Sequence, residues 1–99
     1  ARGVLKVVSI IEYIKSHGGL PISTKNLSDT FGISGLEVRK IINSARCEGC
    51  PICSCHKGYY YSENEREIQK TIDSLNGRIG AMERAKLGLA KCLRGTHEV

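Results

Sequence analysis

The first third of the chain alternates apolar runs at helical spacing with short breaks. In residues 4–16 valines and isoleucines share one helical face, with charged side chains between them, which predicts a first helix that Gly18-Gly19 ends. The proline-marked segment Leu20-Pro21-Ile22 predicts a short extended piece. Ser23 then suits the N-cap of a second helix over residues 24–31.

The clearest helix start follows the break at Gly32-Ile33. Ser34 and Glu37 have the spacing of a capping box, and the periodicity continues to Arg46 before Gly49 and Pro51 stop it. The apolar face of this predicted helix consists of Val38, Ile41, Ile42 and Ala45. Its other side carries Leu36, Arg39, Lys40, Asn43 and Arg46. We therefore expect one buried face and one exposed face rich in hydrogen-bond donors.

From residue 51 to residue 61 the apolar period changes to two, with a turn at His56-Lys57-Gly58, which predicts a β-hairpin. Ser62 and Glu65 form a second capping-box pattern that predicts the start of a last helix. Within it, apolar residues recur at alternating spacings of four and three, and only Lys86 interrupts them: Ile68, Ile72, Leu75, Ile79, Met82, Leu89 and Leu93.

Length, charge and cysteine content narrow the classes of protein. Ninety-nine residues allow one small domain and one extra element, too little chain for a large buried catalytic pocket. The net charge of +5 favours a polyanionic partner, and residues 1–58 contain eight Lys or Arg against four acids. Five cysteines, an odd number, suit a reducing compartment, and no window is apolar enough to span a membrane, so we expect a cytoplasmic protein.

The order helix, short strand, helix, three-residue turn, helix and hairpin is that of a winged helix. Residues 20–61 resemble the small winged helix-turn-helix proteins of bacteriophages and prophages, through LPISTKNL, FGISGLEVRKIIN and KGYYYS. The resemblance implies an α+β, mainly helical fold, with a winged helix-turn-helix domain in residues 1–62 and a C-terminal amphipathic helix in residues 63–99. It also implies sequence-specific binding of double-stranded DNA, as a transcriptional regulator or a phage DNA-processing factor.

A helix has the width of the major groove, so the helix that starts at Ser34 is the expected reader of bases. We expect Arg39 to contact guanine, Asn43 to contact adenine and Leu36 to contact a thymine methyl group. The expected phosphate contacts come from the N-terminus of this helix and from basic side chains around it: Ser34, Lys25, Lys40 and Arg46. His56 and Lys57 in the hairpin turn are expected to reach the neighbouring groove or phosphates. The alternative is that the basic side chains of this helix form an ordinary solvent-exposed surface and contact no DNA.

Four cysteines and a histidine cluster around the hairpin, and two interpretations stay open. Cys47 and Cys50 have the spacing of two zinc ligands, and Cys53, Cys55 and His56 could supply the remaining ligands of a site. However, Cys53 and Cys55 share one strand face, where small thiols serve as core residues. We expect plain thiols, no bound metal and no cofactor.

The heptad-like spacing in residues 63–99 predicts an apolar stripe that another helix or domain must bury. A second copy of the chain would make a homodimer through residues 63–99, which is the expectation here. The alternative is a kinked helix folded back on its own domain, which Gly77, Gly80 and Gly88 would permit.

Two classes of function compete. DNA binding is the first, and the second is a winged-helix interaction module that binds or inhibits a host protein. We expect no enzyme, because the sequence contains no nucleophile with a matching base, no phosphate-binding glycine loop and no paired carboxylates with an evident pocket.

Overall fold

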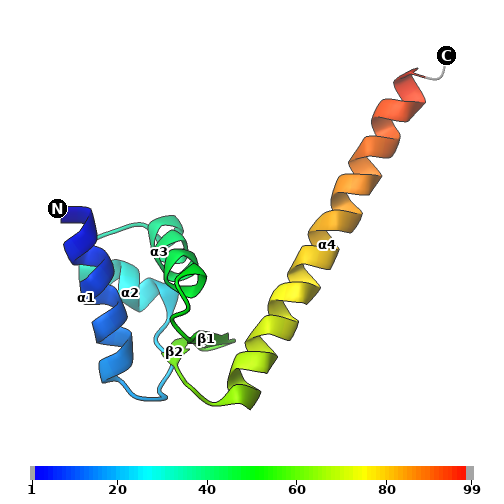
Figure 1. The fold of residues 1–99 in the computed structure, drawn as a ribbon. Coiled ribbons are helices and arrows are strands. Elements are labelled where there is room, and N and C mark those ends of the chain that lie inside the picture. The colour runs from blue at the N-terminus through cyan, green and yellow to red at the C-terminus, as the bar shows by residue number, and fades with distance from the viewer. Residues whose placement is uncertain (1, 98–99) are drawn as a thin grey trace. The chain divides into compact units, whose positions relative to one another are not determined.

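The computed structural model describes residues 2–97, and their side chains over residues 9–93. In chain order the elements are α1 (Arg2–Ser16), α2 (Thr24–Phe31), α3 (Gly35–Cys47), β1 (Ile52–Cys55), β2 (Gly58–Tyr61) and α4 (Glu65–His97) (Figure 1). The chain is mainly helical, with a small two-stranded antiparallel sheet and a long C-terminal helix. Its contacts divide it into two compact units, Ala1–Ile68 and Gln69–Val99.

Local hydrogen bonds start the short helices where the sequence predicts. The Ser23 hydroxyl accepts a hydrogen bond from the Asn26 amide at 3.0 Å, and the Ser34 hydroxyl accepts one from the Glu37 amide at 3.1 Å. Both serines have extended backbones, as N-caps require. Between the two helices Gly32 adopts a left-handed backbone with φ of 64°. The predicted N-caps of α2 and α3 are therefore confirmed.

The start of α4 differs from the prediction. The Asn64 side chain accepts hydrogen bonds from the amides of Arg66 and Glu67, at 2.9 and 3.2 Å, so Asn64 is the N-cap. The Ser62 hydroxyl instead accepts from the Asn64 amide at 3.1 Å. Ser62 as N-cap was thus wrong by two residues, because its hydroxyl closes a turn that precedes the helix.

The hairpin is joined to the chain before α2. Strands β1 and β2 pair in the register Cys53 with Tyr60, around a two-residue turn. On the other edge of β2, Ile22 and Tyr59 exchange two backbone hydrogen bonds, at 2.8 and 2.9 Å. The predicted extended segment at residues 20–22 therefore supplies a one-residue third strand beside β2.

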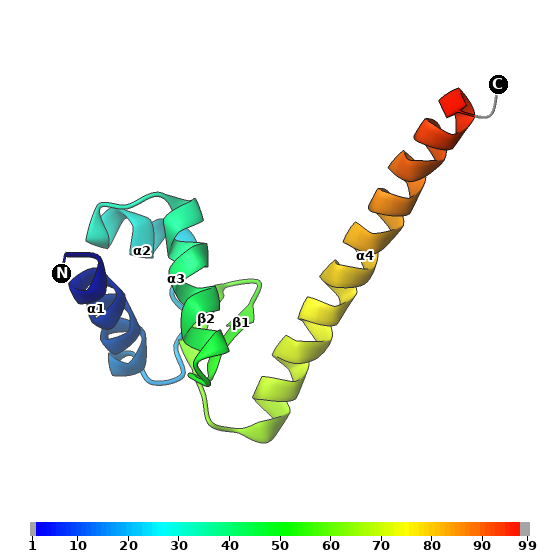
Figure 2. The same cartoon turned by 45° about the horizontal axis from the view of Figure 1, so that its top comes forward.

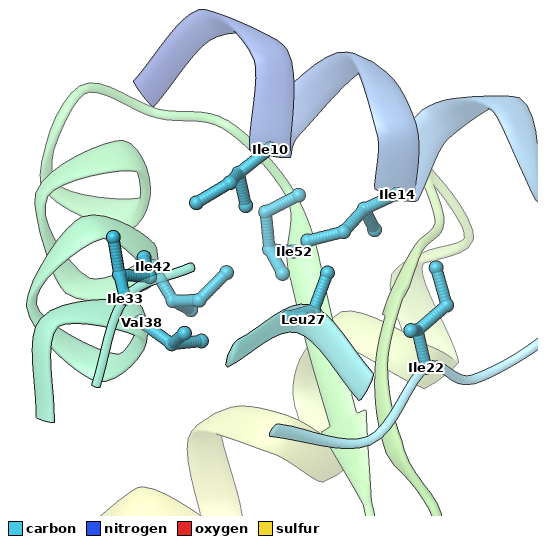
Figure 3. Close-up of a cluster of buried hydrophobic side chains, with 8 residues drawn as sticks. All are labelled: Ile10, Ile14, Ile22, Leu27, Ile33, Val38, Ile42 and Ile52. Carbon is cyan, nitrogen blue, oxygen red and sulfur yellow. The ribbon is translucent and has the colours of Figure 1, made fainter. Parts of the chain in front are cut away.

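A single apolar core joins the three short helices to this sheet. The buried cluster contains Ile10, Ile14, Ile22, Leu27, Ile33, Val38, Ile42 and Ile52, whose side chains converge in Figure 3. The helices α1, α2 and α3 and the strand β1 all contribute to it, and α1, α2 and α3 group with the hairpin in Figure 2. Burying these side chains against one another holds α3 at a defined angle to the rest.

The two faces of the hairpin have different neighbours. Tyr59 and Tyr61 pack against the core together with Ile52, because alternate residues of a strand share a face. Tyr60 lies on the opposite face and donates its hydroxyl hydrogen bond to the Glu67 carboxylate at the start of α4. Of the three consecutive tyrosines, the outer two therefore cover the core and Tyr60 does not.

Candidate nucleic-acid interface

The outer face of α3 presents an unpaired basic and polar surface. Leu36, Arg39, Lys40 and Asn43 are all exposed, and Leu36 retains 55% of its accessible area. Their spacing of three and four residues places them on one side of the helix. Among the side chains that the structure describes, no carboxylate forms an ion pair with Arg39 or Lys40. This surface can donate hydrogen bonds to an acceptor-rich partner without first breaking an internal contact.

The beginning of α3 and the neighbouring helix α2 carry two further candidates. Ser34 is exposed and its hydroxyl caps the helix, which leaves its own hydrogen free to be donated. Lys25 on α2 pairs with Asp29 at 2.8 Å between Nζ and Oδ2. This hydrogen bond and the negative charge of Asp29 raise the pKa of Lys25, so its side chain is cationic at neutral pH.

The tip of the hairpin is the second exposed basic element. His56 and Lys57 form the two-residue turn between β1 and β2, and both are exposed. Gly58 follows with φ of 139°, a conformation that glycine adopts readily. A Cβ at this position would clash with the Ile22 carbonyl group and lie 2.7 Å from the Ser23 amide nitrogen. The close approach of these backbones sets the position of the turn.

Arg46 has a different environment from the one that the sequence suggested. Its Nε donates a hydrogen bond to the Ile52 carbonyl at 2.8 Å, and Nη2 donates one to the Ser54 hydroxyl at 3.2 Å. The guanidinium also lies over the Tyr59 ring, 5.8 Å from its centre. Arg46 therefore fastens the end of α3 to β1, although its charge and spacing suggested a phosphate contact.

The cysteines of the hairpin region have unlike surroundings. Cys53 is buried and Cys50 is half-buried, whereas Cys47 and Cys55 are exposed. In the part of the chain that the structure describes, no group of three His, Cys, Asp or Glu side chains is arranged to hold a metal ion. Cys53 is buried as expected, but it lies on the hairpin face of Tyr60 and outside the cluster of eight core residues, and Cys55 on that face is exposed.

An open hollow of about 400 Å³ lies on the face of the hairpin that turns away from the core. It is lined by Gly19, Pro21, Cys55, Tyr60, Tyr61, Ser62 and Glu67. The hydrogen bond to Glu67 and desolvation raise the pKa of Tyr60 far above its usual value, and a 2.8 Å hydrogen bond to Glu63 raises that of Tyr61. Both hydroxyls are therefore neutral hydrogen-bond donors in which no nucleophilic phenolate develops at neutral pH.

Comparisons with known proteins do not assign the chain to a family. No family model, no curated protein and no solved structure matches the chain. None of the helices in residues 2–97 is both long and apolar enough to cross a membrane.

Proposed function

We propose that residues 1–62 form a winged helix-turn-helix that binds double-stranded DNA. The supporting geometry is the pair α2 and α3 joined by the turn at residues 32–34, followed by a hairpin whose strand β2 pairs with Ile22. A winged helix has this arrangement of a helix pair and a small antiparallel sheet. The resemblance to small phage and prophage proteins of this kind points the same way.

The outer face of α3 is the observation that carries the proposal. Arg39 is suited to a bidentate contact with guanine, Asn43 to adenine and Leu36 to a thymine methyl group. Lys40 beside them is suited to the phosphate backbone, as is the N-terminus of the helix at Ser34. These side chains are exposed, while Val38 and Ile42 on the other face of the helix are buried in the core, so the backbone of α3 is already ordered before binding.

Contacts from outside α3 complete the proposed surface. His56 and Lys57 in the turn of the wing would meet phosphates or a neighbouring groove, and Lys25 would hold the backbone near α2. We leave Arg46 out of the surface, because its guanidinium is engaged by Ile52, Ser54 and Tyr59.

The proposed DNA-binding form is a homodimer through α4. Its apolar residues on one side are exposed in the single chain, among them Ile79, Met82, Leu89 and Leu93 at 57–73%. Two copies would bury this stripe and provide two recognition helices for a two-fold symmetric site. No catalytic role is proposed.

Salt dependence of binding tests the proposal. The native chain should bind a pool of random duplex DNA with an affinity that falls steeply between 50 and 200 mM salt, as fluorescence anisotropy would report. Lys40→Ala should weaken binding to all sequences and lower the salt slope by about one. Arg39→Ala should instead relax the preference among sequences selected from the pool, by about 1–3 kcal/mol at one base pair. Arg84→Ala, an exposed arginine on α4, is the matched control.

Two results would contradict the proposal. Binding that is equally weak at all salt concentrations would show that the basic face does not meet phosphate. Equal effects of Arg39→Ala and Arg84→Ala would show that α3 is not the reading element. Either result together with a tight protein partner would favour the alternative, a winged-helix interaction module.

A further inference from the structure

One side of α4 carries an apolar stripe with the period of a coiled coil. Ile72, Ile79, Met82, Leu89 and Leu93 are between 43% and 73% exposed, and Ile68 and Leu75 are half-buried. The stripe from Ile68 to Leu93 is about 39 Å long at 1.5 Å per residue. It is longer than the width of a small domain core, so its natural cover is another helix of equal length.

The residue types on the stripe favour a two-stranded parallel arrangement. Written as a heptad, the a positions are Ile72, Ile79, Lys86 and Leu93, and the d positions are Ile68, Leu75, Met82 and Leu89. Isoleucine at a with leucine at d favours parallel dimers, and the middle of the stripe follows this combination, with Ile72 and Ile79 at a and Leu75 and Leu89 at d. A single lysine at an a position specifies the register and the oligomeric state of a coiled coil, at a cost in stability.

The glycines of α4 do not interrupt this seam. Gly77, Gly80 and Gly88 occupy the outward positions f, b and c. A Cβ at Gly77 or Gly88 would have no atom of the described residues within 4 Å, so these glycines serve no packing contact in that part of the chain. They weaken the helix intrinsically but leave every a and d position occupied by a side chain.

The charged residues beside the seam distinguish the two possible orientations. Arg78 is at g and Glu83 is at the following e position, the pair that faces across a parallel dimer. In register, Arg78 meets Glu83 of the partner subunit, and two-fold symmetry makes this pair twice. With the same stripes aligned antiparallel, Arg78 faces alanine and Glu83 faces asparagine, so neither charge meets an opposite charge on the other copy.

Lys86 supports the same orientation. In a parallel dimer both copies of Lys86 fall in one layer, where their flexible stems can reach the rim. Within one chain Nζ of Lys86 lies 3.7 Å from the Glu83 carboxylate, so the ammonium already points toward that rim. An antiparallel dimer would place each Lys86 against Leu75 and thus disrupt two apolar layers.

We infer that α4 docks on α4 of a second copy as a parallel, in-register, two-stranded coiled coil, oriented by Arg78, Glu83 and Lys86. This inference rests on the homodimer in the proposed function and specifies its geometry. Because both coils then begin at the same end, the two copies of the first unit leave the coil side by side. Such a dimer is suited to two adjacent DNA half-sites.

A charge exchange in the full-length chain tests the orientation. Arg78→Glu and Glu83→Arg should each weaken the homodimer about tenfold, because two attractive pairs become two repulsive ones. An equimolar mixture of the two variants should form heterodimers of nearly native affinity, since each g position again faces an opposite charge. Sedimentation equilibrium at low salt gives the affinities, and native mass spectrometry identifies the heterodimer. Arg84→Glu, at the outward f position, is the control and should change the affinity less than twofold.

The outcomes separate orientation from dimerisation and from DNA binding. Dimers of native affinity for both variants, with statistical mixing, would overturn the parallel arrangement while leaving a dimer. A native chain that is monomeric at micromolar concentration would overturn the homodimer itself. The anisotropy titration of the random duplex DNA pool by the same samples reports separately whether the first unit binds DNA.

Discussion

Replacing Gly58 by alanine is the sharpest test of how the hairpin is attached to the rest of the first unit. Gly58 opens β2 with φ of 139°, and its Cα faces the backbone of Ile22 and Ser23. An added Cβ would overlap the Ile22 carbonyl group and approach the Ser23 amide nitrogen to 2.7 Å. Since these obstacles are backbone atoms, no side chain can rotate to make room.

The expected cost combines strain with lost hydrogen bonds. A non-glycine residue in this backbone conformation costs about 1–3 kcal/mol. Separating Ile22 from β2 breaks two backbone hydrogen bonds with Tyr59, of 2.8 and 2.9 Å, which are worth about 0.5–1.5 kcal/mol each. We therefore expect Gly58→Ala to lower the free energy of unfolding by about 2–6 kcal/mol. A domain of this size has only about 3–10 kcal/mol in total.

Urea denaturation followed by circular dichroism measures this loss, and Gly32→Ala is the matched control. Gly32 also has a positive φ, of 64°, but a Cβ there has no atom within 4 Å. It should therefore cost only the left-handed strain of about 1–2 kcal/mol. If Gly58→Ala destabilised the protein no more than Gly32→Ala, the close approach of the two backbones would not be a stabilising contact.

Four further predictions follow from individual contacts. Tyr60→Phe should lower the free energy of unfolding by about 1 kcal/mol at neutral pH. Because folding raises the pKa of Tyr60, the stability that its hydroxyl contributes is fully present below pH 10 and is lost as the pH rises above 10. Urea denaturation of the native protein and the variant at neutral pH and above pH 10 would show this loss. Arg46→Lys should cost about 1–3 kcal/mol in urea unfolding, since an ammonium cannot reproduce the two directed hydrogen bonds to β1. Gly77→Ala should stabilise α4 by up to about 1 kcal/mol and raise its thermal midpoint, and a lower midpoint would mean that the glycine is needed for a bend. Treatment with a strong chelator should leave the circular dichroism unchanged, and elemental analysis should find less than one zinc per chain, because the cysteines of residues 47–55 have unlike exposures.

The sequence by itself determined those parts of the protein that depend on near neighbours. The starts of α2 and α3 follow from Ser23 and Ser34, whose hydroxyls cap an amide three residues away. The hairpin turn at His56-Lys57 and the apolar stripe of α4 follow from periodicity in the same way. The exposed residues of α3 were predictable too, because a helix with one buried face must turn the other side outward.

Only the tertiary structure decided which partner each ambiguous residue takes. Arg46 and Arg39 are equivalent in charge, yet the approach of β1 to the end of α3 offers acceptors to Arg46 alone. Likewise, consecutive tyrosines are alike in sequence, and Tyr60 is directed to Glu67 because the pairing of β2 with Ile22 and β1 fixes which face meets the core. These contacts join residues that are distant along the chain or on different elements. Hydrophobic periodicity and capping signals act within a few residues, so they contain no information about such pairings.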